Sequence, residues 1–356
     1  MKTVAYASPW VPPEWIAAHG LRPHWARLGP AKRLARLGAG RGVCPFAGAF
    51  VESLGPEKGT GPICAKHPEG GHQPKAGRGK LDLSPFPAAV VLTTACDQMR
   101  YAAALVEQTG TLPVFLLNVP STWQTAAARQ LYRDEVERLG RFLVRLGGAS
   151  PSADELRRVM LGYDRARSAI RQTRPRLSAR RFAEALVNLR GGINSAGHGP
   201  PSARQEQAPG VPLALLGGPL VEQDYPLLDA VEQAGGRIVL DATESGERTL
   251  PAPLDPGRLR DDPLDAMVEA YFAHIVDVFR RPNHRLYDWL AGEVAERGVR
   301  GLLLRRYLWC DLWHAELHRL RQRSAVPVLE LDAVDDEPGS LERTLGRIEA
   351  FLEILR

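Results

Sequence analysis

One local pattern occurs twice in the chain, at Cys96 and at Cys310. Each cysteine ends a mainly apolar run and is followed at once by an aspartate and a stretch with helical character. A Pro-Val pair then opens a second apolar run, and in both cases this proline lies 17 residues after the cysteine. A helix between two strands predicts that the strands pair in parallel. The chain is therefore predicted to contain two α/β units, each with a thiol at the carboxyl end of a strand, where such folds build their sites.

The rest of the chain divides into segments of different composition. Its 356 residues are enough for two or three domains. Strands that alternate with helices predict an N-terminal α/β domain over 1–120 and a C-terminal α/β domain over 211–356. Helical periodicity covers 121–196, and a linker rich in glycine and proline covers 197–210. The predicted fold class is α/β, with two open parallel sheets of the Rossmann or flavodoxin-like type, a helical segment, and a cleft between the sheets.

Two further segments carry local predictions. Residues 38–87 are rich in Gly, Pro and Lys with little periodicity, so they are predicted to form a long irregular loop. Residues 263–279 place their apolar side chains on one stripe, which predicts a single helix.

Charge and hydropathy exclude several classes of function. The net charge is +5, but the arginines stand among aspartates and glutamates, as on solvated helix faces. No zinc-finger spacing or aromatic RNA-binding motif is present, so we expect no nucleic-acid partner. No apolar run reaches the ~18 residues of a membrane helix, and prolines interrupt the first segment where a signal peptide would be apolar. We therefore expect a cytoplasmic protein without membrane contact.

The four cysteines are too few for a disulfide framework in a chain of this length, so metal binding or redox chemistry is a better interpretation. Cys44, Cys96 and Cys310, drawn from two domains, would suit an iron–sulfur cluster that leaves one iron open. Buried free thiols are an alternative, because free cysteine is among the most buried residue types. Zinc is another, although no Cys-x-x-Cys pair is present. Cys64, close to His67, indicates either a local metal site or a solvated loop.

Several segments, in the same order along nearly the whole chain, resemble the 2-hydroxyacyl-CoA dehydratase family, which includes benzoyl-CoA reductase subunits. The closest similarity is the Cys-Asp-x-Met-Arg pattern that begins at Cys96. Asn118 and Gly218 stand where the family usually has an acid and a serine. The similar segments are 13–23, 44–46, 94–100, 117–120, 216–220, 309–311 and 344–351.

The resemblance implies one [4Fe–4S] cluster held by Cys44, Cys96 and Cys310, with its open iron facing an acyl-CoA thioester in the cleft. In this family an ATP-dependent iron–sulfur activator protein supplies one low-potential electron. The thioester carbonyl becomes a ketyl radical, which expels the 2-hydroxyl group, loses a β-proton and returns the electron. The resemblance also implies a homologous subunit, in a homodimer or a heterodimer. Two other functions stay open: a double-cubane-type reductase of small molecules, and a non-catalytic subunit that lends structure or carries electrons.

Five further residues are candidates for the site. Ser8 and Glu14 are predicted to be catalytic, although a loop serine before proline and an acid in the first turn of a helix also occur without function. Arg100 is predicted to bind substrate by pairing with a CoA phosphate or an acid, but a surface arginine would fit equally well. Gly217 and Gly218 form a turn that would admit a phosphate or thioester closely, and a lone glycine turn is a weak signal.

Overall fold

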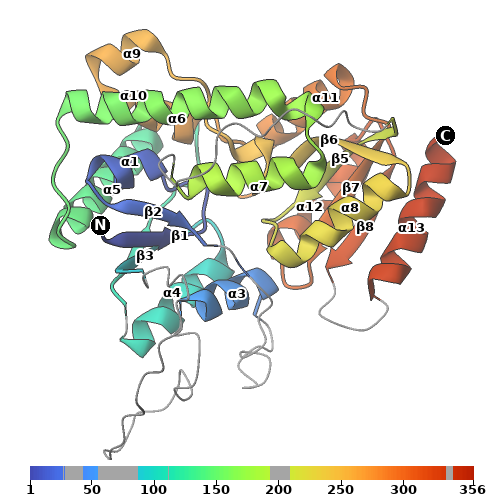
Figure 1. Ribbon diagram of the computed structural model, residues 1–356, viewed down its shortest axis with the longest axis horizontal. Coiled ribbons are helices and arrows are strands. Elements are labelled where there is room, and N and C mark those ends of the chain that lie inside the picture. The colour runs from blue at the N-terminus through green and yellow to red at the C-terminus, as the bar shows by residue number, and fades with distance from the viewer. Residues whose placement is uncertain (27, 29–42, 55–86, 111, 193–208, 334–339) are drawn as a thin grey trace, which may run out of the picture.

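The computed structural model describes residues 1–26, 28, 43–54, 87–110, 112–192, 209–333 and 340–356. Within these residues the chain forms two four-stranded sheets in which every strand pair is parallel. Helices cover both sheets, so the molecule is an α/β protein of two domains, which confirms the predicted fold class (Figure 1). None of the described helices is long and apolar enough to cross a membrane.

The first sheet has the strand order β2-β1-β3-β4. Alternate residues of its strands point to opposite faces: Val90 and Leu92 pack with α3 and α4, whereas Ala89 and Val91 pack with α1 and α5. The elements are β1 (Thr3–Tyr6), α1 (Pro13–Ala18), β2 (Arg22–Trp25), α3 (Pro45–Ser53), β3 (Ala89–Thr93), α4 (Asp97–Thr109), β4 (Val114–Leu117) and α5 (Ala126–Arg145).

Long helices then connect the two sheets. The helix α5 is followed by α6 (Ala153–Thr173), the short η1 (Arg174–Arg176) and α7 (Ala179–Arg190). Side chains of Thr125, Ser152 and Ser178 accept hydrogen bonds from first-turn N–H groups, which explains where α5, α6 and α7 begin. Helix α7 contacts β2 of the first sheet and α8 and β6 of the second, so it bridges the two domains (Figure 1).

The second sheet has the order β6-β5-β7-β8. Helices α7, α8 and α13 cover one face, and α11 and α12 cover the other. The elements are β5 (Val211–Gly217), η2 (Glu222–Asp224), α8 (Tyr225–Gln233), β6 (Gly236–Thr243), η3 (Glu247–Thr249), α9 (Pro256–Asp261), α10 (Pro263–Val268), η4 (Glu269–Ala273), α11 (His284–Glu296), β7 (Gly301–Tyr307), α12 (Asp311–Arg323), β8 (Val328–Ala333) and α13 (Ser340–Leu355).

The two cysteine-containing patterns fold as predicted, as β3–α4–β4 and β7–α12–β8. The prediction of one helix over 263–279 is wrong: α10 passes into the π-helix η4 and helical structure ends at Ala273. The carbonyl of Phe272 instead accepts from Arg280 at 2.5 Å, and that of Ala273 accepts from Arg285 at 2.6 Å. Arginine side chains thus replace the N–H donors that a longer helix would supply.

The predicted loop over 38–87 is wrong for its first part, because α3 occupies Pro45–Ser53. Residues 55–86, with Cys64 and its predicted local metal site, lie outside the described residues. The boundary placed at 197–210 also stays a prediction, since 193–208 lie outside them.

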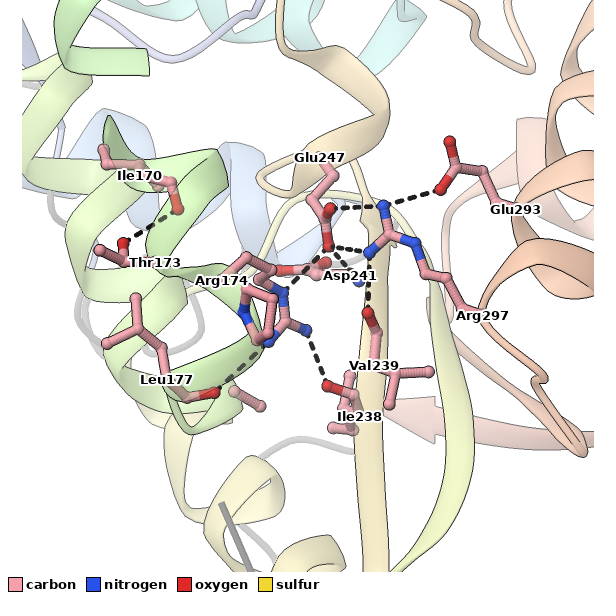
Figure 2. Close-up of polar contacts among 12 residues, drawn as sticks. Ile170, Thr173, Arg174, Leu177, Ile238, Val239, Asp241, Glu247, Glu293 and Arg297 are labelled. Carbon is pink, nitrogen blue, oxygen red and sulfur yellow. Dashed lines mark hydrogen bonds and ion pairs between the residues drawn. The ribbon is translucent and has the colours of Figure 1, made fainter. Parts of the chain in front are cut away.

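A half-buried carboxylate ties the helical segment to the second sheet. Glu247, in η3, contacts Arg174 of η1 at 3.1 Å and Arg297, which follows α11, at 2.8 Å. Arg174 also donates to the carbonyl of Ile238 in β6 at 2.7 Å, and Arg297 donates to that of Val239 at 2.8 Å (Figure 2). Because the charged groups and backbone acceptors satisfy one another, this junction holds the helical segment against the second sheet.

Candidate metal centre

Each of the three predicted ligand cysteines precedes a helix. Cys44 is the N-terminal cap residue of α3, Cys96 of α4 and Cys310 of α12. All three contact one apolar cluster, to which the first domain contributes Leu92 and the second contributes Tyr307. Cys44 is 8% exposed, while the other two are half-buried. The structure therefore brings thiols from both domains to a single place.

The thiols lie close enough together for the charge of one to shift the pKa of another. Burial raises the pKa of Cys44, that of Cys96 to about 11 and that of Cys310 to about 12. The charges of Cys44 and Cys96 raise the pKa of Cys310 further, and that of Cys44 raises the pKa of Cys96. In the metal-free protein, burial therefore favours the protonated form of these thiols at neutral pH.

Backbone N–H groups oppose this effect of burial. The sulfur of Cys44 accepts from Phe46 and Ala47, that of Cys96 from residues 98 and 99, and that of Cys310 from Trp313, and each contact lowers the pKa of its thiol. Such donors at helix starts favour the thiolate, which is the form that binds a metal.

Gln98 connects two of the ligand segments. Its side-chain oxygen accepts a hydrogen bond from the backbone N–H of Cys44 at 2.8 Å. Because Gln98 itself lies in the first turn of α4, this bond fixes the start of α3 against the helix that follows Cys96.

The donor set can be compared with the ligands of an iron–sulfur cluster. No three His, Cys, Asp or Glu side chains of the described residues are grouped to hold one metal ion. In a cluster each thiolate binds a different iron, and thiolates are the usual ligands. Three thiols with N–H donors, all in contact with one apolar cluster of side chains, are of the type that this chemistry uses.

Glu244, which the sequence analysis did not single out, lies near all three thiols. It follows β6 directly and its charge raises the pKa of each cysteine. Burial, and then the charge of Asp277, raises the pKa of Glu244 itself to about 8. Its position in the sequence could have marked it as a candidate, because, like Cys96 and Cys310, it comes just after an apolar strand.

The turn at Gly217 and Gly218 lies against Glu244, whose N–H donates to the carbonyl of Gly217 at 3.1 Å. Gly217 has φ +142°, and a Cβ atom there would come within 1.8 Å of the carbonyl oxygen of Arg305. The close approach of β5 and β7 therefore requires glycine at 217. At Gly218 the nearest atom would be 3.7 Å away, in the ring of Tyr307. Substrate binding by this turn stays a prediction.

Ser8 and Arg100 lie beside the loop that carries Cys96. The hydroxyl of Ser8 is buried and accepts from Thr93, the last residue of β3, at 3.1 Å. Arg100 donates to the carbonyl of Thr94 at 3.1 Å and lies 3.4 Å from Asp97, with half of its side chain exposed. Arg100 therefore braces the loop before Cys96, and its predicted substrate contact stays a prediction.

Glu14 lies away from the thiols. Helix α1 covers the face of the first sheet opposite to α3 and α4. One carboxylate oxygen of Glu14 pairs with Arg167 of α6, and the other accepts from the hydroxyl of Tyr271 at 2.6 Å. Both oxygens are thus engaged within the core, so the structure gives Glu14 a structural role that accounts for its burial, and its predicted catalytic role is untested.

Comparison with known proteins supports the predicted relationship. Residues 10–355 match the family described as 2-hydroxyglutaryl-CoA dehydratase, D-component. No curated protein matches the chain at a significant level. The family match covers both domains, including the three cysteines predicted to be ligands, and confirms the resemblance seen in the sequence segments. The chain therefore belongs to the 2-hydroxyglutaryl-CoA dehydratase D-component family.

Proposed function

We propose that this protein is the iron–sulfur subunit of a radical (R)-2-hydroxyacyl-CoA dehydratase or of a related acyl-CoA reductase. Family membership supports a component of a 2-hydroxyacyl-CoA dehydratase-type system. The proposal of an iron–sulfur subunit rests on one observation: Cys44, Cys96 and Cys310 all contact one apolar cluster built from both domains. Three thiolate ligands leave one iron of a [4Fe–4S] cluster free for substrate.

The chain's own residues would perform four tasks. The three cysteines hold the cluster, and Gln98 fixes two of their segments to each other. A [4Fe–4S] cluster, when bound, supplies a single low-potential electron and an open iron. Apolar neighbours such as Tyr307 and Leu92 keep water from the buried side of the site. Glu244, with its raised pKa of about 8, can hold a proton on its carboxyl group at neutral pH.

The proposal includes two protein partners and a cytoplasmic setting. A homologous subunit, in a homodimer or a heterodimer, and an ATP-dependent iron–sulfur activator protein would act with this chain. Leu308 and Trp309, immediately before Cys310, are 59% and 46% exposed. Large apolar side chains exposed next to a site are typical of a surface that contacts another protein.

The test is turnover under strictly anaerobic conditions. The purified chain, with the homologous subunit if one is encoded beside it, is mixed with the activator, ATP, a reductant and a panel of (R)-2-hydroxyacyl-CoA esters. Formation of the 2-enoyl-CoA product, or of a reduced acyl-CoA, supports the proposal. A protein that binds about eight irons and reduces small molecules instead would be a double-cubane-type reductase. A colourless, stable protein that leaves these esters unchanged would be a non-catalytic partner.

A further inference from the structure

Arg305 is a buried cation with an unused hydrogen-bond donor. It lies in β7 and is 3% exposed. Its Nη2 donates to Asp224 Oδ1 at 2.5 Å, and its guanidinium carbon lies 4.2 Å from the centre of the Tyr307 ring. Its Nη1 is buried and has no hydrogen-bond partner among the described residues. A buried donor without a partner costs free energy, so it needs an explanation.

The position of Arg305 relates it to the candidate metal centre. The Tyr307 ring lies 6.5 Å from the ring of Phe46, which is in the first turn of α3 directly after Cys44. Tyr307 and Cys44 belong to the same apolar cluster. Within this cluster the charge of Arg305 opposes burial by lowering the pKa of Cys44. Buried protein, and not water, therefore lies between the Arg305 cation and the start of α3, and an interaction through protein is only weakly screened.

A role in holding the loop after β5 explains the contacts of Asp224 and Tyr307, but it does not explain the unpaired Nη1 of Arg305. Asp224 accepts from the N–H of Val221 at 2.8 Å, and the hydroxyl of Tyr307 donates to the carbonyl of Pro219 at 3.0 Å, so the pair holds the loop after β5. Asp224 could be held there by its backbone contact alone. The free Nη1, and the ring contacts that lead from Arg305 through Tyr307 to Phe46 beside Cys44, point instead to a negative charge that Arg305 would help to balance.

We propose that Arg305 is a positioning residue that acts through Cys44 and holds the reduction potential of the bound cluster at a higher value than burial alone would give. This inference rests on the proposed cluster. A one-electron reduction adds a negative charge to the cluster, and a buried cation stabilises the reduced form more than the oxidised form.

The experiment is a redox titration of the reconstituted protein, followed by electron paramagnetic resonance. R305Q is expected to disfavour reduction at least tenfold, which is a shift of about 59 mV to more negative potential for one electron. R305K should stay close to the wild type because it keeps the charge. D224N should shift the potential in the opposite direction, because it removes the anion beside Arg305. A role confined to holding the loop would give no such opposite shifts.

Two further variants keep the test decisive. Arg306 is the next residue of β7, and its side chain pairs with Asp332 of β8 at 2.7 Å, so R306Q is a matched control expected to shift the potential less than R305Q. If R305Q alone does not fold, the double variant R305Q/D224N is compared with D224N, from which it differs only by the loss of the Arg305 charge, and it should have a lower potential than D224N. Cluster binding with an unchanged potential in R305Q, or with equal potentials in D224N and the double variant, would overturn this inference while leaving the proposed function intact. A wild-type chain that binds no iron would overturn both.

Discussion

Replacing Glu14 tests whether its burial is structural. Glu14 and Arg167 are each 2% exposed and form an ion pair between α1 and α6. The variant Glu14→Gln keeps the shape but removes the charge, which leaves Arg167 with only Asp164, 3.7 Å away, as a counter-ion. Removing one partner of a buried ion pair typically costs about 3–5 kcal/mol. Because glutamine can still accept from Tyr271, we expect a loss of about 3 kcal/mol in the free energy of unfolding.

Urea denaturation followed by tryptophan fluorescence measures this loss, since Trp15 lies in the same helix as Glu14. Tyr271→Phe is the matched control, because it removes one hydrogen bond to the carboxylate and no charge, and should cost about 1.5–3 kcal/mol. The double variant Glu14→Gln/Arg167→Met should be less destabilised than the sum of its two single variants, because no isolated charge is left in the core.

The opposite pattern would refute this reasoning. If the free energy of unfolding of Glu14→Gln lies within about 0.5 kcal/mol of that of the wild type, the ion pair does not stabilise the fold. Loss of turnover in such a stable variant would instead assign Glu14 to the chemistry, as predicted from the sequence.

Three further predictions concern the site itself. Gly217→Ala should lower the free energy of unfolding by about 3 kcal/mol or more, and Gly218→Ala by less than about 1 kcal/mol. The reason is that only a Cβ atom at 217 collides with backbone. Equal losses of stability in the two variants, measured by thermal unfolding, would contradict this. Gln98→Ala should accelerate loss of iron to a chelator, because the N–H of Cys44 loses its 2.8 Å hydrogen bond to Gln98. An unchanged rate of iron loss would show that this bond does not hold the segments of Cys44 and Cys96 together. In the metal-free protein, alkylation of Cys96 should be slow at pH 8 and should rise steeply as the pH approaches 11, because its thiolate forms only there. Rapid alkylation at pH 7 would show that the thiol is not buried as described.

Local sequence patterns predicted the parts of the fold that repeat. The two Cys-Asp patterns gave β3–α4–β4 and β7–α12–β8, because an apolar run, a helix start and a Pro-Val strand start are all local signals. Strand β2 and helix α3 were missed. The first has the polar residues Arg22 and His24 within it, and the second lies in a Gly- and Pro-rich stretch whose helical character depends on packing against α4.

The interior arginines could not be predicted from composition. The intermixed charges of the sequence predicted that the basic residues are solvated, and several surface helices agree with that. Six arginines of the described residues are nevertheless at most 6% exposed and bind backbone carbonyls, carboxylates or aromatic rings: Arg167, Arg174, Arg190, Arg248, Arg280 and Arg305. Their partners come from distant parts of the chain, so no local pattern marks them. The position of Glu244 after an apolar strand was a local signal, but its effect on the three thiols depends on how the two domains meet.

The central claim is that sulfur atoms from both domains hold a single cluster. Iron and acid-labile sulfide per chain, measured after anaerobic reconstitution, test it in the wild type and in the variants Cys44→Ser, Cys96→Ser and Cys310→Ser. We expect about four irons in the wild type and a marked loss of iron in each of the three variants. Full iron content in all three serine variants, or a wild type that binds no iron, would contradict the account.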